Sequence, residues 1–171
     1  MPKGIYQHKS TQGFKGGYIP WNKNKKMSKE FSEKVIVGFP PNYKEIKKFF
    51  ILQKGVVFCW GDTIYSPDGA FISLDLQAHE KTHSIQQVDY GNIKKWWERY
   101  LKDPNFRLAM EVPAYQIQYR EAKKISKDRN KLFNYLVALA KDLSGGMYGS
   151  IMTFQDAVNA IKNNKVYKFK V

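Results

Sequence analysis

Residues 75–91, DLQAHEKTHSIQQVDYG, contain the pattern His-Glu-x-x-His at His79, Glu80 and His83. We expect this stretch to form a helix with Asp75 as its N-cap and the closing glycine as its terminator. Helix positions i and i+4 share one face, so both imidazoles can reach a single ion. Glu80 lies about 100° round the helix, where it can take a proton from metal-bound water without binding the metal. The pattern predicts a Zn²⁺ site with Glu80 as the catalytic base.

A zinc site that keeps one position open for water needs a third protein ligand. Cys59 is the only cysteine and His8 is the only other histidine, far upstream, so we expect an acid. Glu111, on a second predicted helix, is the preferred third ligand. Asp89 is the alternative. Six residues of continuous helix make about 600°, which turns Asp89 about 120° away from the face that carries His83.

The wider sequence resembles the gluzincin-like small zinc metallopeptidases that phages and bacteria encode. The resemblance covers about residues 56–160 and rests on residues 79–87, 96–100 and 111–119. It implies a protein or peptide substrate and a metal held by His79, His83 and Glu111. It also implies a tyrosine that stabilises the oxyanion, for which Tyr115 is the first candidate and Tyr119 the second. In zincins a sheet edge beside the metal helix holds the substrate backbone, and we expect Asp62 to Tyr65 to form that edge.

Capping residues and apolar patterns predict the other elements. Strands over residues 56–60 and 62–65 are expected to form a hairpin. Helices are expected at residues 44–52, 93–102, 104–125, 129–144 and 153–162. Pro113 lies inside the longest helix, which should kink there or restart at Glu111. The expected fold class is α+β, a mostly helical zincin-like domain with a small antiparallel sheet or hairpin.

Some residues near the pattern have two interpretations. Glu111 can be an ordinary acid that pairs with Arg107 one turn earlier, instead of a metal ligand. Asp75 can accept the imidazole N–H of His79 and orient it, instead of capping the helix. Trp96 and Trp97 are most simply packing residues, with at least one of them buried.

The N-terminal segment differs in composition from the rest of the chain. The net charge is +14, and residues 1–30 carry seven lysines and one acid, with aromatic residues between them. Residues 17–30, GYIPWNKNKKMSKE, resemble the nuclease-associated modular repeats that bind DNA, which implies nucleic-acid binding through residues 1–30. We expect residues 1–38 to be a basic, flexible arm and residues 39–171 to be the metallopeptidase domain.

No apolar run approaches the roughly 20 residues of a membrane span, and no secretory signal is found, so we expect a cytoplasmic protein with no membrane contact. It can be phage-encoded, and then reside in the host cytoplasm or the virion. The main hypothesis is a zinc metallopeptidase. The alternative is a basic nucleic-acid-binding protein with a structural or vestigial metal site. A virion component with an inactive protease fold is a third hypothesis.

Overall fold

The computed structural model describes residues 34–52 and 54–163. The expected α+β fold is confirmed, since helices dominate and one three-stranded sheet is present in these ranges. The strands are β1 (Lys34–Val37), β2 (Phe58–Trp60) and β3 (Thr63–Ser66). The helices are α1 (Tyr43–Phe49), α2 (Leu74–Asp89), α3 (Ile93–Lys102), α4 (Pro104–Ile125), α5 (Arg129–Leu143) and α6 (Phe154–Lys162), with a 3-10 turn at Gly146–Tyr148.

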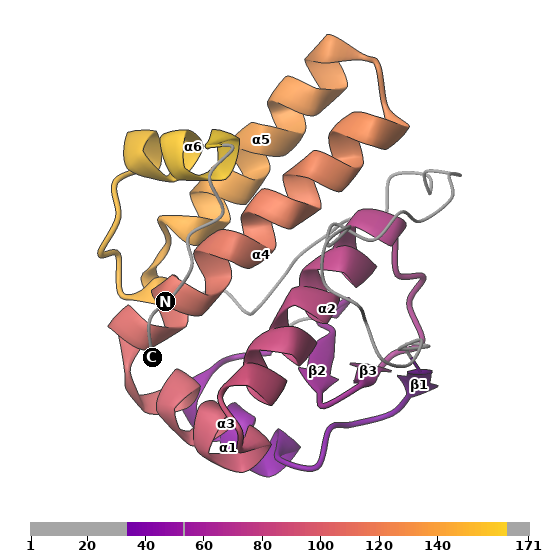
Figure 1. Cartoon of the computed structure of the whole chain (residues 1–171), viewed down its shortest axis with the longest axis vertical. Coiled ribbons are helices and arrows are strands. Elements are labelled where there is room, and N and C mark those ends of the chain that lie inside the picture. The colour runs from indigo at the N-terminus through magenta and orange to yellow at the C-terminus, as the bar shows by residue number, and fades with distance from the viewer. Residues whose placement is uncertain (1–33, 53, 164–171) are drawn as a thin grey trace.

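Helix α2, which carries the His-Glu-x-x-His pattern, lies between the sheet and α4 (Figure 1). Helices α4 and α5 run side by side, and α6 packs against both of them (Figure 1). Helix α3 connects α2 to α4 and packs against each. This arrangement places the pattern in the interior, with the sheet on one side and α4 on the other.

The sheet has the order β1-β3-β2. The predicted hairpin is confirmed, because β2 pairs with β3 in antiparallel register from Phe58↔Tyr65 to Trp60↔Thr63. Strand β1 adds a parallel pairing to β3, from Lys34↔Thr63 to Val37↔Ser66, so the sheet is mixed. Residues 34–37, which the sequence analysis included in the N-terminal arm, are thus part of the folded sheet.

The expectation that Asp62 to Tyr65 form a free sheet edge is wrong, because β3 is the central strand and pairs on both sides. The edge strand beside α2 is β2, and it is occupied as well. The Cys59 carbonyl accepts hydrogen bonds from Gln87 Nε2 at 3.0 Å and from Trp97 Nε1 at 3.2 Å. Side chains from α2 and α3 therefore occupy the Cys59 carbonyl of this edge strand.

Side chains cap the N-terminal ends of most of the described helices. Asp103 accepts from two backbone N–H groups at the start of α4, and Asp128 does the same for α5. Thr153 caps α6 by accepting a hydrogen bond from the backbone N–H of Asp156. Helix α2 differs from expectation: its N-cap is Ser73, and Asp75 is a buried residue of the first turn. Asp75 is therefore available for a different contact.

Helix α4 continues through Pro113 and does not restart at Glu111. Proline has no N–H, so the Ala109 carbonyl loses its partner within the helix.

Arg107 does not form the ion pair with Glu111 that the sequence offered as an alternative. Its guanidinium donates to the carbonyls of Tyr100, Leu101 and Met147 at 2.6–3.0 Å, and so satisfies the C-terminal end of α3.

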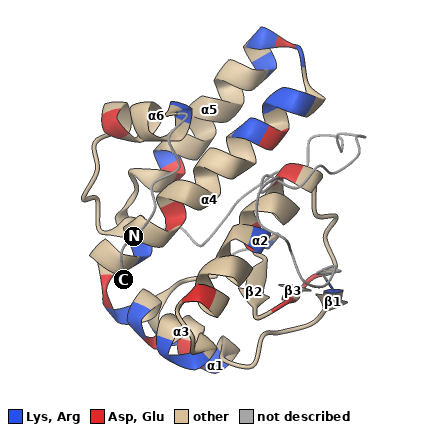
Figure 2. Cartoon of the chain, viewed as in Figure 1, with Lys and Arg blue, Asp and Glu red and all other residues tan. Residues whose placement is uncertain are grey.

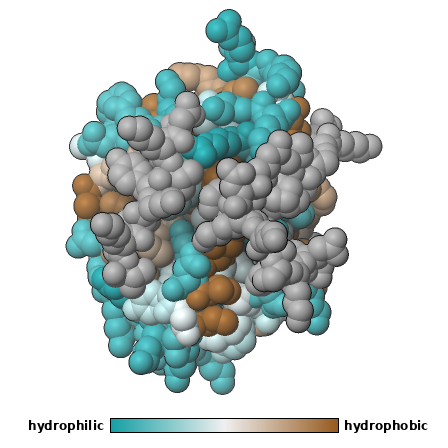
Figure 3. Space-filling model, viewed as in Figure 1, coloured by the Kyte–Doolittle hydropathy of each residue, from teal (hydrophilic) through white to brown (hydrophobic). Residues whose placement is uncertain are grey.

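Charged side chains lie on the outside of this frame. Figure 2 shows Lys and Arg along α1 and α3 and at the end where α4 meets α5. The coloured part of the face in Figure 3 is mainly hydrophilic, with a compact hydrophobic area near the end of α2. In the described ranges, no helix combines the length and apolar character needed to cross a bilayer.

Candidate metal centre

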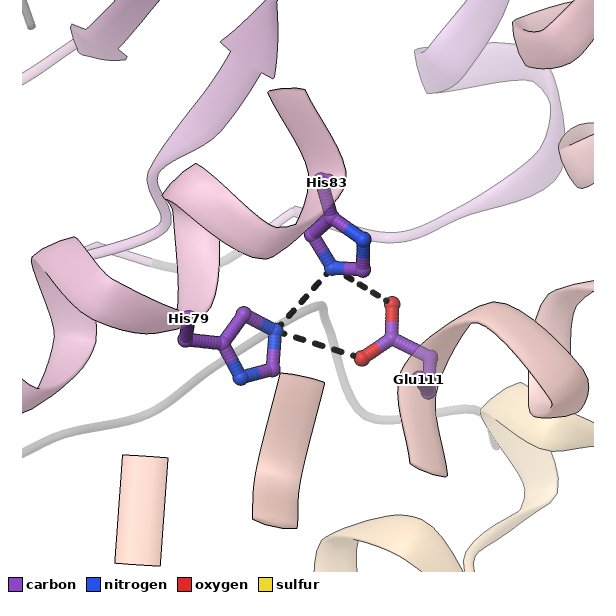
Figure 4. A group of neighbouring side chains, drawn as sticks. All are labelled: His79, His83 and Glu111. Carbon is purple, nitrogen blue, oxygen red and sulfur yellow. Dashed lines mark hydrogen bonds and ion pairs between the residues drawn. The ribbon is translucent and has the colours of Figure 1, made fainter. Parts of the chain in front are cut away.

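Three side chains converge between α2 and α4 (Figure 4). His79 and His83 project from α2, and Glu111 projects from α4. The two Nε2 atoms lie 3.0 Å apart, and each lies 3.3 Å from one oxygen of Glu111. All three residues are buried, and their ligand atoms lie within 4.8 Å of one another. This group can hold a metal ion, and within residues 34–52 and 54–163 no other His, Cys, Asp and Glu side chains form such a group.

The spacing of these atoms is close to that of a tetrahedral metal site. Two ligand atoms bound at about 2.0–2.1 Å with a tetrahedral angle lie about 3.3 Å apart. The observed separations of 3.0, 3.3 and 3.3 Å are close to that value. Two imidazoles and one carboxylate are also a common donor set for zinc in catalytic sites. The residues present therefore fit a metal ion held in tetrahedral geometry.

A glutamine side chain orients the His83 ring. Gln86 Nε2 donates to the Met110 carbonyl at 2.8 Å, and a carbonyl can only accept, so Gln86 Oε1 is the atom 2.9 Å from His83 Nδ1. An amide oxygen also only accepts, which places the neutral ring's hydrogen on Nδ1. The Nε2 lone pair of His83 is then left for the metal.

His79 is held in the same way from α4. Its Nδ1 lies 2.9 Å from Gln118 Oε1, and Gln118 Nε2 donates to the Tyr135 hydroxyl at 2.8 Å. The ring of Tyr115 packs edge-on against the His79 imidazole, with centroids 5.1 Å apart. Both imidazoles are buried and direct Nε2 toward the carboxylate of Glu111.

The charges in this cluster depend on one another. Burial lowers the pKa of His79 to about 4. Burial also opposes the charge on His83, but the Glu111 carboxylate outweighs it and raises the His83 pKa to about 9. Burial alone would raise the pKa of Glu111, but the two imidazoles hold it well below its usual range. A positive charge on His83 therefore stabilises the Glu111 carboxylate. A metal ion can supply that positive charge in place of the His83 proton.

Glu80 lies beside this group without belonging to it. It lines one small cavity together with His83 and Glu111, and it is 2% exposed. Burial raises its pKa to about 8, with a smaller opposing effect from His83. A buried acid with a pKa near neutral, next to a metal-binding group, is the arrangement expected of a general acid–base.

The cavity is closed by β2 and α3. Its volume is about 10 Å³, the scale of a single water molecule. The walls are formed by the backbone and side chains of residues 57–59 and by Trp96, Trp97 and Tyr100. The indole N–H of Trp96 has no hydrogen-bond partner among the described residues, although the side chain is 1% exposed. Trp96 therefore lines the cavity and carries a buried indole N–H that has no partner among the described residues.

The tyrosines differ from expectation in their positions. Tyr115 is fully buried, and its hydroxyl lies 3.4 Å from that of Tyr148. Neither Tyr115 nor Tyr119 lines the cavity. Tyr100 does, and its hydroxyl donates to Glu111 Oε1. Sequence reasoning missed Tyr100, although its i+4 spacing from the tryptophan at position 96 placed the two on one helix face.

Asp89, the alternative third ligand, and Asp75, the alternative partner of His79, both lie outside the metal-binding group. Asp89 is exposed at the last turn of α2, outside the metal-binding group. Helix α2 stays continuous to this residue, which is why Asp89 faces away from His83. Asp75 does not contact His79 directly, and its carboxylate accepts a hydrogen bond from the Tyr135 hydroxyl.

The fold and the site define a mostly helical α+β protein with a buried His-His-Glu group that can hold a metal ion. No family model, no curated protein and no solved structure matches this chain. The segment that resembles DNA-binding repeats, residues 17–30, lies outside the described residues.

Proposed function

We propose that this protein is a zinc-dependent hydrolase and that it acts on peptide bonds. The observation that carries the proposal is the position of Glu80. Two of the three potential metal ligands, His83 and Glu111, line the same cavity as Glu80, which is itself outside the ligand group. A purely structural zinc site is usually filled by four protein ligands and needs no additional buried acid beside it.

Zinc is favoured over other metals by the donor set. Two imidazole nitrogens and one carboxylate oxygen suit zinc, whereas magnesium and calcium prefer oxygen ligands throughout. Three protein ligands also leave one coordination position open. When bound, zinc would supply a Lewis acid that polarises a carbonyl group and lowers the pKa of water to about 7.

Glu80 would move the proton. Its carboxylate accepts a proton from the attacking water as the water oxygen bonds to the carbonyl carbon, and then delivers it to the departing amine nitrogen. The pKa of about 8 applies without a bound metal ion, whose positive charge would favour the carboxylate form. The carboxylate form then exists near neutral pH, where a base is needed.

Two donors would serve the carbonyl oxygen as it gains negative charge. The hydroxyl of Tyr100 and the indole N–H of Trp96 belong to residues that line the cavity containing Glu80. The Tyr100 hydroxyl has one hydrogen, which it donates to Glu111 Oε1, so the hydroxyl would have to turn from that oxygen to the carbonyl oxygen during the reaction. Tyr100 takes the place of Tyr115 in this proposal, since Tyr115 packs in the core.

Substrate entry requires movement. His79, Glu80, His83 and Glu111 are each no more than 6% exposed, and the cavity is far smaller than a peptide. The wall formed by β2 and α3 must open before a peptide bond can reach Glu80. Under this proposal, the described geometry corresponds to the closed state of the enzyme.

Replacing Glu80 by Gln tests the proposal. We expect Glu80→Gln to reduce cleavage of a mixed peptide library by at least about 10²-fold, because the base is lost. Zinc content, measured by mass spectrometry of the metal, should stay near one per chain. Glu98→Gln is the matched control, since Glu98 is exposed on α3. Full cleavage by Glu80→Gln, or a native chain that binds no zinc, would contradict the proposal.

The net charge of +14 favours a second candidate, a nucleic-acid-binding protein in which any metal is structural. The seven lysines in residues 1–30 would supply the phosphate contacts. The two functions are compatible in one chain, and they are separated by their dependence on Glu80 and on residues 1–30.

A further inference from the structure

A chain of hydrogen bonds leads from His79 to a buried acid on the same helix by way of two other helices. His79 Nδ1 lies 2.9 Å from Gln118 Oε1 on α4, and Gln118 Nε2 lies 2.8 Å from the Tyr135 hydroxyl on α5. The Tyr135 hydroxyl donates to Asp75 Oδ2, one turn before His79 on α2. The chain therefore joins three helices at the metal centre.

The direction of this chain is set at its far end. A carboxylate only accepts hydrogen bonds, so the Tyr135 hydroxyl must use its single hydrogen on Asp75. The tyrosine oxygen is then an acceptor for Gln118 Nε2, and the amide must turn its oxygen toward His79. Burial and the neighbouring Asp75 charge hold the Tyr135 pKa well above its usual value, so the hydroxyl keeps this hydrogen.

Asp75 has no other evident reason to be buried. It is 2% exposed, it does not cap α2, and its Oδ1 has no hydrogen-bond partner among the described residues. A buried carboxyl group with one unsatisfied oxygen lowers stability. The hydrogen bond from Tyr135 is thus the interaction that accounts for its position.

We propose that Asp75 and Tyr135 are positioning residues that fix the orientation of the Gln118 amide and thereby keep the hydrogen of neutral His79 on Nδ1, with Nε2 free for the metal. This inference rests on the metal site of the proposed function and does not depend on hydrolysis. It assigns a role at the metal centre to α5, a helix that contributes no ligand.

Loss of the Tyr135 hydroxyl has a specific consequence. Without it, the Gln118 amide can turn by 180° and present its NH₂ group to His79 Nδ1. That nitrogen must then accept, the ring hydrogen moves to Nε2, and the metal-binding lone pair is blocked. Asp75→Asn acts similarly, because an amide can donate to the Tyr135 oxygen and so reverse the whole chain.

The test measures zinc affinity of the full chain by competition with a fluorescent zinc chelator. We expect Tyr135→Phe and Asp75→Asn to weaken zinc binding by about 10-fold to 100-fold, the usual effect of losing such a partner. Tyr119→Phe is the matched control, since it removes a hydroxyl from the residue next to Gln118 and should leave affinity unchanged. Thermal unfolding of each metal-free variant checks that the fold is retained.

A rescue variant separates orientation from general damage. A carboxylate at position 118 accepts the His79 hydrogen whichever way it turns, so adding Gln118→Glu to Tyr135→Phe should restore most of the zinc affinity. A merely structural loss at Tyr135 would not be restored by this change. Wild-type affinity in Tyr135→Phe, or no rescue by Gln118→Glu, would overturn the inference.

Nuclear magnetic resonance of the metal-free protein gives a second readout. Nitrogen-15 shifts of the His79 ring distinguish a hydrogen on Nδ1 from one on Nε2. We expect the Nδ1 form in the native chain and an increased Nε2 form in Tyr135→Phe, and unchanged populations would contradict the inference. This measurement needs no bound zinc, so it tests the chain of hydrogen bonds even if the proposed hydrolase function fails.

Discussion

The hydroxyl of Tyr100 on α3 donates a hydrogen bond to Glu111 Oε1 on α4. Glu111 Oε1 also lies 3.3 Å from His83 Nε2, so one carboxylate oxygen joins α2, α3 and α4. Because Tyr100 also lines the cavity with Glu80, α3 both covers the site and contributes a polar group to it.

Replacing Tyr100 by Phe should lower kcat/KM about 10-fold to 10³-fold while zinc content stays near one per chain, because a donor to the developing oxyanion is lost. Tyr115→Phe, which removes a hydroxyl that faces Tyr148, should leave kcat/KM within about threefold and lower the melting temperature slightly. Steady-state kinetics on a cleaved peptide check both. A larger rate loss in Tyr115→Phe would restore Tyr115 as the catalytic tyrosine.

The third ligand is tested by two single substitutions. We expect Glu111→Gln to lose stoichiometric zinc, because a neutral amide is a poor ligand and leaves the cluster without its negative charge. Asp89→Asn should retain one zinc per chain, since Asp89 is exposed at the end of α2. Equilibrium dialysis with metal analysis gives both values. If Asp89→Asn also loses its zinc, the ligand set inferred from the geometry is incorrect.

Zinc binding should release a proton from His83. Its pKa of about 9 without metal means that it is charged at pH 7, and a metal ligand must be neutral. Apparent zinc affinity should therefore rise by up to about tenfold per pH unit up to pH 9 and level off above it. Calorimetry at pH 7 in two buffers of different ionisation enthalpy counts the protons, and the prediction is wrong if none is released.

Metal-free protein should lose stability as pH rises, because of Glu80. Its pKa is raised from 4.5 to about 8 in the folded state, so the folded chain holds a proton that the unfolded chain releases between these values. The free energy of unfolding therefore falls between pH 4.5 and 8. Glu80→Gln removes this effect and should be the more stable protein at pH 8, by on the order of a few kcal/mol. Urea unfolding at pH 5 and pH 8 measures the difference, which should be much smaller at pH 5.

Residues 1–30 should control binding to nucleic acid. Deleting them removes seven lysines, so affinity for a DNA duplex should fall and its dependence on salt should become shallower. Glu80→Gln should leave DNA binding unchanged. Fluorescence anisotropy at several salt concentrations compares the three chains. Equal binding by the deleted and full-length chains would assign the DNA affinity to another part of the surface.

Three features of the structure could not be predicted from the sequence. They are the position of Tyr100 in the cavity wall, the pairing of β1 with β3 and the contact between Tyr135 and Asp75. Tyr100 lines the site because α3 folds back between α2 and α4, which no local pattern reveals. Strand β1 pairs in parallel with β3 across an intervening helix and hairpin, and such non-local pairing has no turn signal of its own. Tyr135 reaches Asp75 from 60 residues away, so that contact was equally invisible.

The sequence by itself determined the helices and the ligand pair. Helix ends depend on capping atoms a few residues away, as at Asp103 and Thr153, and the i, i+4 spacing of His79 and His83 follows from helix geometry alone. Glu111 was the acid preferred from the sequence, but only the tertiary structure brings it to the two histidines. Glu111 is buried beside both imidazoles because α4 packs on α2, while Asp89, far nearer in sequence, faces outward because α2 continues without a break.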